Sequence, residues 1–239
     1  MSEYRSGDNA GDGLDRLVWN ALHTNQSGIG TCLAKACRYQ AEFAPFSAIA
    51  DTGEEAVAQL RSLLEVGETI YLSGEKPERL DGLAYTHTVP CLQMLLPADA
   101  PIAEEQAGQA FEIVPLGVAD VPTMLALTTL TAPGPFRTRT YEMGNYAGIW
   151  QDGALIAMAG ERMSTGPYRE ISAVCTHPEH TGRGYAAAML SHHMRLHRQQ
   201  GLRSCLHVAS VNERAIAVYR RMGFEVQREV TLHQLTRVD

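Results

Sequence analysis

Several features are missing from this 239-residue sequence, and each absence removes a class of protein. No apolar run approaches the roughly 20 residues of a membrane-spanning helix, so no membrane contact is expected. The formal net charge is −7, which argues against nucleic acid as a partner, because phosphate binding needs a basic face. The five cysteines are odd in number and form no C-x-x-C pair, so we expect a reduced, cytoplasmic chain without structural zinc or a metal cofactor.

The chain is long enough for one large domain or two small ones. Its start, "MSEYRSGDNAGDG" (1–13), is polar and acidic, unlike a signal peptide, and we interpret it as a disordered leader. Residues 14–110 form an N-terminal α/β part with helices expected at "GLDRLVWNALHT" and "GEEAVAQLRSLLEVG" and strands at "FSAIAD" and "ETIYLSGE". Its last segment, 97–110, is rich in Ala, Pro and Glu and is the best candidate linker.

Residues 111–239 show a clearer order of elements. A helix is expected at "VADVPTMLALTTLT", a hairpin at "YAGIWQDGALIAMAGERMS", a strand at "YREISAVCTH" and a long helix over 184–200. A strand "SCLHVAS", a helix "NERAIAVYRRMG" and a last strand or hairpin "FEVQREVTLHQL" follow. This order predicts an α/β domain with a central mixed sheet.

Two glycines, Gly182 and Gly184, stand directly before the long helix. The first four N–H groups of a helix have no partner inside it, and they bind phosphate where the backbone can be approached closely. Glycine removes the side chains that would block this approach, while Thr181 and Arg183 add a hydroxyl and a charge. The loop therefore predicts a site for a phosphoanhydride.

Two commoner phosphate motifs fit less well. The Walker A pattern G-x-x-x-x-G-K-[ST] is absent. A G-x-G-x-x-A match occurs at Gly182, Gly184 and Ala187, but it lies late in the chain and outside a first βαβ unit. A dinucleotide-binding domain is therefore disfavoured.

The stretch "ISAVCTHPEHTGRGYAAAML", together with "HVASVNERAIAVYRRMGFE", resembles the GNAT superfamily of acyl-CoA-dependent N-acyltransferases over residues 112–235. The resemblance implies a mixed sheet in which two parallel strands splay apart, with acetyl-CoA as cosubstrate in the gap and a smaller α/β part preceding this fold. The sequence departs from the family's pattern at Glu179, where Gln or Arg is usual, and at Thr181, where many members carry a basic residue.

The resemblance also implies which residues hold acetyl-CoA. Backbone N–H groups of the glycine loop and the helix start would bind the pyrophosphate, and the end of the preceding strand would face the pantetheine. Asn212 would contact the cofactor arm, although it is equally suited to cap the helix that begins at Glu213. The candidate cofactor-binding residues are Val174, Cys175, Thr176, Gly182, Arg183, Gly184, Tyr185, Ala186 and Asn212.

Acyl transfer from a thioester to an amine needs a neutral amine, a polarised carbonyl and a proton for the leaving thiolate. The position that often supplies this proton in the family corresponds to Tyr219. Tyr219 also shares a helical stripe with Ala215 and Met222, so a core tyrosine is the alternative.

Two carboxylates, Glu161 and Glu170, lie at strand ends and are candidate bases, although each is also typical of a solvated charge. Strand alternation predicts Glu170, Ser172 and Val174 on one face. A neutral acceptor amine would need no base at all.

His193 and His197 have the i, i+4 spacing of metal ligands but no H-E-x-x-H motif, and they lie on the stripe of Ala186, Met189 and Leu190. We expect them to be structural. Cys175 is interpreted as a small buried strand residue rather than a nucleophile, because direct transfer needs none.

Three functions remain open. The first is acetyl transfer from acetyl-CoA to a small amine or amino acid. The second is acetylation of a protein lysine or N-terminus, and the third is a non-catalytic acyl-CoA sensor. The N-terminal part is open as well: it is a degenerate second copy of the fold, a cover for the acceptor, a subunit interface as in a homodimer, or a structural extension. It has no Gly-x-Gly before a helix, so a second cofactor is not expected.

Overall fold

The computed structural model describes residues 13–102 and 111–239, here called the first and second halves. Almost all of the leader predicted at 1–13, and most of the linker predicted at 97–110, lie outside the described residues. The described helices are α1 (Leu17–His23), α2 (Glu54–Ser62), α3 (Val121–Thr131), α4 (Tyr185–Gln199) and α5 (Glu213–Arg221). None of them is both long and apolar enough to cross a membrane.

The strands of both halves join in one 11-stranded mixed sheet, in the order β1-β2-β3-β4-β11-β5-β10-β9-β8-β7-β6. The first half supplies β1 (Gly30–Cys32), β2 (Ala36–Tyr39), β3 (Phe46–Ile49), β4 (Thr69–Ser73) and β5 (Leu83–Leu95). The second half supplies β6 (Val114–Pro115), β7 (Tyr146–Gln151), β8 (Ala154–Thr165), β9 (Tyr168–Thr176), β10 (Arg203–Ala209) and β11 (Glu225–Arg237).

The two halves repeat one order of elements. The first runs α1-β1-β2-β3-α2-β4-β5, and the second runs α3-β7-β8-β9-α4-β10-β11, with β6 added before and α5 inserted near its end. In each half three strands pair antiparallel, and the third is parallel to the strand that follows the helix, β3 to β4 and β9 to β10. The parallel strands meet because a helix carries the chain back between them.

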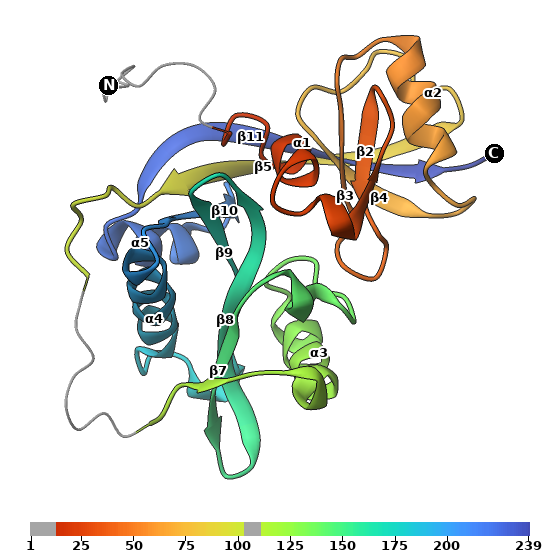
Figure 1. Ribbon diagram of the computed structural model, residues 1–239. Coiled ribbons are helices and arrows are strands. Elements are labelled where there is room, and N and C mark those ends of the chain that lie inside the picture. Colours follow the sequence, from red (N-terminus) through yellow and green to blue (C-terminus); the bar gives the residue numbers. More distant parts are fainter. Residues whose placement is uncertain (1–12, 103–110) are drawn as a thin grey trace.

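The last strand of each half pairs inside the other half. Strand β5 pairs with β10, and β11 pairs with β4. The two exchanged strands also pair with each other, antiparallel, from Leu95↔Glu225 to Leu83↔Arg237. Figure 1 shows them running side by side from one half into the other.

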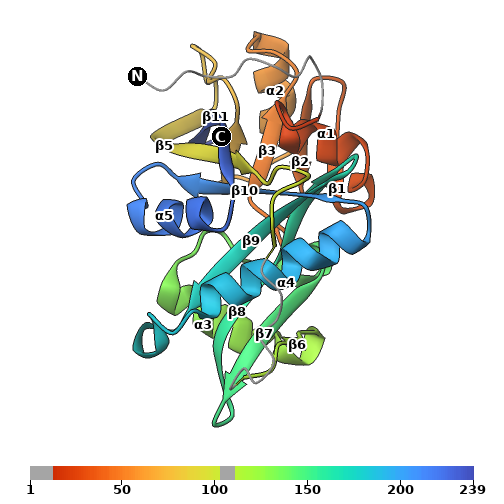
Figure 2. The ribbon, with the colours of Figure 1, turned by 90° about the vertical axis from the view of Figure 1, so that its left-hand side faces the viewer.

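Strands β9 and β10 splay apart, as the family resemblance implied. They pair in parallel only from Tyr168↔Arg203 to Glu170↔Cys205. Beyond Glu170 the carboxyl-terminal half of β9 has no partner in β10. The end of β10 remains paired with β5 on its other edge. Helix α4 crosses this part of the sheet and contacts β8, β9 and β10 (Figure 2).

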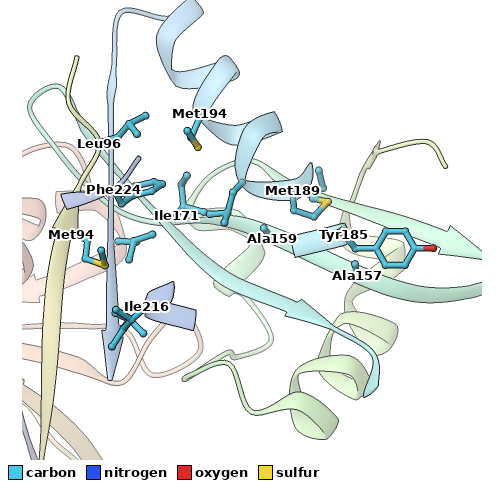
Figure 3. Close-up of a cluster of buried hydrophobic side chains, with 14 of the residues drawn as sticks. Met94, Leu96, Ala157, Ala159, Ile171, Tyr185, Met189, Met194, Ile216 and Phe224 are labelled. Carbon is cyan, nitrogen blue, oxygen red and sulfur yellow. The ribbon is translucent and has the colours of Figure 1, made fainter. Parts of the chain in front are cut away.

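The core beneath α4 draws on both halves. Met94 and Leu96, from β5 and the residue after it, lie in one buried cluster with Met194 of α4, Ile216 of α5 and Phe224 (Figure 3). Met94 is completely buried there. The first half therefore completes the hydrophobic core of the second.

The sequence interpretation missed one element that this arrangement depends on. The sequence analysis assigned no element to Leu83–Leu95, whose Pro90 is unusual within a strand. The structure makes it the longest strand of the first half, with Pro90 opposite Thr231. The segment "FEVQREVTLHQL", left open between a strand and a hairpin, is the single strand β11.

We expect Met94→Ala to destabilise the whole chain by about 2–5 kcal/mol, the usual cost of emptying a buried methionine site. Since the halves share one sheet, urea should unfold both in a single transition, before and after the substitution. Val118→Ala, at a side chain that is 72% exposed, is the control and should change the free energy of unfolding little. Two separated transitions in the wild-type protein would contradict this prediction.

Candidate active site

The glycine loop has the backbone shape that an anion site needs. Gly182 and Gly184 have φ angles of 80° and 83°, which are left-handed values that L side chains rarely adopt. Gly184 is the N-cap of α4, and no side chain caps the helix there. A Cβ atom built on either glycine meets nothing within 4 Å, so there is open space beside the start of the helix.

That open space is a cavity of about 430 Å³ between the start of α4 and helix α5. Gly182, Gly184 and Tyr185 line one side, and Arg214 and Arg221 line the other. The sequence interpretation missed the two arginines. Their i, i+7 spacing places them on one face of α5, and helical periodicity could have identified them as the cationic wall of an anion site.

A second cavity, of about 210 Å³, adjoins the first and shares Thr176, Ala186 and Val218 with it. It extends to Cys175 and Tyr219, between the end of β9 and α5. Together the two cavities form a groove, which we call the cofactor groove. It is lined by eight of the nine candidate cofactor residues: Val174, Cys175, Thr176, Gly182, Gly184, Tyr185, Ala186 and Asn212.

The ninth candidate, Arg183, is exposed between the two glycines and does not line the groove. Asn212 caps a helix and also lies at the groove. Its Oδ1 accepts a hydrogen bond of 3.1 Å from the N–H of Ala215, so it caps α5, and it also lines the smaller cavity. The helix cap fixes the end of α5 that carries Arg214.

Strand β9 carries a β-bulge where it borders the groove. Ala173 has a φ of 51°, and the pairing with β8 slips between Gly160↔Ser172 and Met158↔Cys175. A bulge leaves one residue out of the ladder and bends the strand, which turns backbone groups of β9 toward the gap.

The bulge also corrects one expectation. Alternation had placed Glu170, Ser172 and Val174 on a single face. Instead Val174 packs against the same core cluster as Ile171, beneath α4, whereas Glu170 contacts residues on the opposite face. The inserted residue reverses the alternation along β9.

Tyr219 lies at the inner end of the groove. It is half-buried, and its ring makes an edge contact with Phe224 at 6.2 Å between centroids. Burial raises the pKa of Tyr219 to about 12, so the hydroxyl stays protonated at neutral pH. Burial likewise raises the pKa of the Cys175 thiol to about 11, which makes it a poor nucleophile.

Glu170 does not line the groove, and its oxygens are occupied. It is completely buried and accepts two hydrogen bonds from Arg162, of 3.0 and 2.7 Å, and one of 2.8 Å from Nδ1 of His207. Burial opposes its charge, but the Arg162 and His207 interactions outweigh burial and hold the pKa of Glu170 well below its usual value. Gln93 donates to Nε2 of His207 at 3.1 Å and completes the network.

Glu161 lies on the other face of the sheet, under α4, and does not line the groove either. It accepts hydrogen bonds from Asn145, at 2.9 Å, and from Nε2 of His197, at 3.2 Å. Burial opposes ionisation, yet these two bonds lower the pKa of Glu161 to about 2. His197 in turn bonds to the Ser204 hydroxyl at 2.8 Å, so the group ties α4 to β8 and β10.

His193 lies beside this group, completely buried, as expected for a structural histidine. Neither ring nitrogen has a hydrogen-bond partner among the described residues. Burial, followed by the nearby His192 and His197, lowers the pKa of His193 to about 4. The ring is therefore neutral at pH 7.

Three groups of side chains in the described residues have the spacing of metal ligands. One is the buried set Glu161, His193 and His197, and a second is His177, Glu179 and His180 on the glycine loop. The third joins α1 to the β1–β2 hairpin and is considered further below. None of them lies at Tyr219.

Comparison with known proteins identifies the class to which this fold and groove belong. Residues 125–224 match the model of the acetyltransferase (GNAT) family. A crystal structure from Novosphingobium aromaticivorans, described as an acetyltransferase of the GNAT family, is 36% identical over 95% of this chain and 99% of its own, with a TM-score of 0.85. The chain belongs to the GNAT family of acetyltransferases.

Two more distant structures share the fold. A GCN5-related N-acetyltransferase from Kribbella flavida is 15% identical, with a TM-score of 0.61 over 93% of this chain and 96% of its own. A tandem GNAT protein from the clavulanic acid biosynthesis pathway is 16% identical, with a TM-score of 0.51 over 85% of this chain and 78% of its own. A search of curated proteins found no match to this chain.

We expect Gly184→Val to weaken acetyl-CoA binding at least about tenfold, measured by calorimetry, because the added side chain fills the space over the helix N-terminus. Gly201→Val is the matched control. Gly201 also has a positive φ, of 70°, and open space at its Cβ, but it lies just beyond the other end of α4. The same affinity in both folded variants would mean that the loop does not hold the cofactor.

The buried His193 should make stability depend on pH. The pKa of His193 is lowered from 6.5 to about 4 in the folded chain. Between these two pH values the unfolded chain therefore has a proton on His193, and the folded chain does not. Stability should therefore fall as pH falls from 6.5 to 4, by up to about 1.4 kcal/mol per pH unit from this group.

His193→Leu should remove this contribution to the pH dependence of urea unfolding, while His87→Leu, at an exposed histidine, should leave it unchanged. If both variants lose stability between pH 6.5 and pH 4 as steeply as the wild type, His193 is not the source of this pH dependence.

Proposed function

We propose that this chain transfers an acetyl group from acetyl-CoA directly to the primary amine of a small molecule or amino acid. The observation that carries the proposal is a single groove with an anion-binding helix start at one end and a protonated tyrosine at the other. Family membership supports acetyl transfer from acetyl-CoA in general. The nature of the acceptor is the proposed step.

The groove can attract a pyrophosphate although no basic side chain stands at Glu179 or Thr181 of the loop. Glu179 is exposed on the loop, and Thr181 stands where a basic residue is common in the family. The N–H groups at the start of α4 and the guanidinium groups of Arg214 and Arg221 would bind the phosphates instead. The pantetheine would then run past Thr176 and Val218 toward Tyr219.

Tyr219 is the proposed acid. The neutral amine attacks the thioester carbonyl, a C–N bond forms, and the C–S bond breaks. Tyr219 donates a hydrogen bond and then its proton to the leaving sulfur, and the one proton lost by the amine passes through solvent to the phenolate and restores the phenol. Since its pKa is about 12, Tyr219 remains protonated through the physiological range.

Glu161 and Glu170 are assigned to positioning rather than proton transfer. Each is buried and already accepts several hydrogen bonds, and each pKa is lowered, so both are weak bases. Glu170 fixes the point where β9 and β10 separate, because it pairs with Cys205 in the ladder and with His207 through its side chain. The acceptor amine would bind in its neutral form.

The size of the smaller cavity supports a small acceptor. Its volume is about 210 Å³, and Thr131 and Pro133, at and just after the end of α3, line one side. Small-molecule sites typically measure about 300–1,000 Å³, so this space suits an acetyl group and a compact amine better than a peptide.

We also propose that the first half is a degenerate copy of the second that binds no acyl-CoA. Helix α2 occupies the place of α4, but its N-cap Gly53 has a φ of −73° and its first turn carries Glu54 and Glu55. A separate cavity of about 500 Å³ lies where β3 and β4 end, and Asp51 and Glu75 help to line it. Four carboxylates line this cavity against two guanidinium groups, those of Arg16 and Arg228, so the excess negative charge would disfavour phosphate.

A screen of amines with acetyl-CoA, read as released thiol, tests the acceptor. We expect release with small primary amines or amino acids and none with lysine peptides. Release with peptides alone would contradict the small acceptor. Tight acetyl-CoA binding without release for any amine would contradict the enzyme and favour a sensor.

Tyr219→Phe tests the acid. We expect kcat to fall about a hundred- to ten-thousand-fold, the usual range for general acid catalysis, with acetyl-CoA affinity nearly unchanged. The ring still packs on Phe224, so the free energy of unfolding should change by no more than about 1.5 kcal/mol. Tyr71→Phe, at a half-buried tyrosine of the first half, is the control. Equal turnover in both variants would mean that water, and not Tyr219, protonates the leaving sulfur.

A further inference from the structure

Two thiols and an imidazole meet at the edge of the first half, far along the sheet order from the cofactor groove. Cys32 and Cys37 are directly opposite each other in the β1–β2 hairpin. His23 is the last residue of α1. A ring nitrogen of His23 and the two sulfurs lie within 4.8 Å of one another.

The ring of His23 is held in place by a hydrogen bond and a ring stack. Its Nδ1 donates to the carbonyl of Trp19 at 2.8 Å, and the ring stacks on that of Trp19 with centroids 4.3 Å apart. Histidines that bind metals almost always donate their other N–H to a carbonyl or carboxylate in this way. The Nε2 lone pair is thereby left for coordination.

The two thiols differ in their surroundings. Cys32 is exposed, and its thiol contacts the carbonyl of Leu22 at 3.8 Å and the thiol of Cys37. Cys37 is completely buried. Burial raises the pKa of both thiols, so neither is a thiolate on its own at neutral pH, and a bound cation would have to displace their protons.

The donor set selects the ion. Two sulfurs and one imidazole nitrogen suit Zn²⁺, whereas Mg²⁺ and Ca²⁺ require oxygen ligands. In a tetrahedral zinc site with Zn–S of about 2.3 Å and Zn–N of about 2.0 Å, the ligand atoms are about 3.5–3.8 Å apart. The three ligand atoms are now separated by up to 4.8 Å, and side-chain shifts of about 1 Å would bring them to these zinc-site distances. Two thiolates also neutralise the divalent ion beside the buried Cys37.

We propose that Cys32, Cys37 and His23 bind one Zn²⁺, with solvent at the fourth coordination position. The exposed Cys32 and His23 give the ion a path from solvent to the buried sulfur of Cys37. The bound ion joins the end of α1 to the three-residue edge strand β1 and to β2. It stabilises the first half because the unfolded chain does not hold the three ligands together.

The experiment uses the full chain, reduced and stripped of metal with a chelator. Co²⁺ is added as a spectroscopic probe, and Zn²⁺ affinity is measured by competition with a chromophoric chelator. We expect one equivalent of Co²⁺ to produce thiolate-to-cobalt charge-transfer absorption and the visible bands of a tetrahedral ion. One equivalent of Zn²⁺ should remove these bands and raise the melting temperature.

Cys32→Ser and His23→Gln should each weaken Zn²⁺ binding at least about tenfold. Both side chains are exposed, so both variants should fold, which circular dichroism would check. Cys91→Ser, at a buried cysteine of β5, is the control and should bind Zn²⁺ like the wild type.

Three results would overturn the proposal. These are failure of the reduced chain to bind stoichiometric Zn²⁺, unchanged affinity in Cys32→Ser, and formation of a Cys32–Cys37 disulfide in air at a rate that stoichiometric Zn²⁺ does not slow. The last result would identify the pair as a redox couple instead.

Discussion

The antiparallel pairing of β5 with β11 is the constraint on which the rest of the molecule depends. Each strand follows the βαβ unit of its own half and pairs inside the other. Strand β5 pairs along Cys205–Ala209 with the edge of β10 that faces away from β9, and over the same stretch β10 separates from β9, which is where the groove lies. The first half is therefore part of the framework of the candidate active site, whatever else it does.

Carboxylates and cationic groups occupy different places in this framework. The carboxylates that hold the sheet and α4 in place, Glu170 and Glu161, are buried and fully hydrogen-bonded. The groove instead relies on backbone N–H groups, two arginines of α5 and a protonated phenol. The backbone N–H groups among them are held in place by the helix and need no rearrangement when an anion binds.

The second half was largely predictable from sequence because its local signals agree. The turn at Asp152–Gly153, the glycines before α4 and Gly223 after α5 each mark the end of an element that the structure contains. The exchange of strands was not predictable, because Leu83–Leu95 gains its partners from residues more than a hundred positions away. The bulge at Ala173 and the burial of Glu161 and Glu170 also arise from tertiary contacts, which periodicity does not encode.

The long separation along the chain between β5 and its partner β11 has a consequence for how the protein is made. During synthesis β4 and β5 leave the ribosome long before β11, and each lacks this one of its two sheet neighbours until Glu225–Arg237 emerges. Neither half can close its sheet as an independent unit on the growing chain. The nascent first half therefore presents two open strand edges for most of translation, a period in which edge-to-edge association or chaperone capture competes with folding.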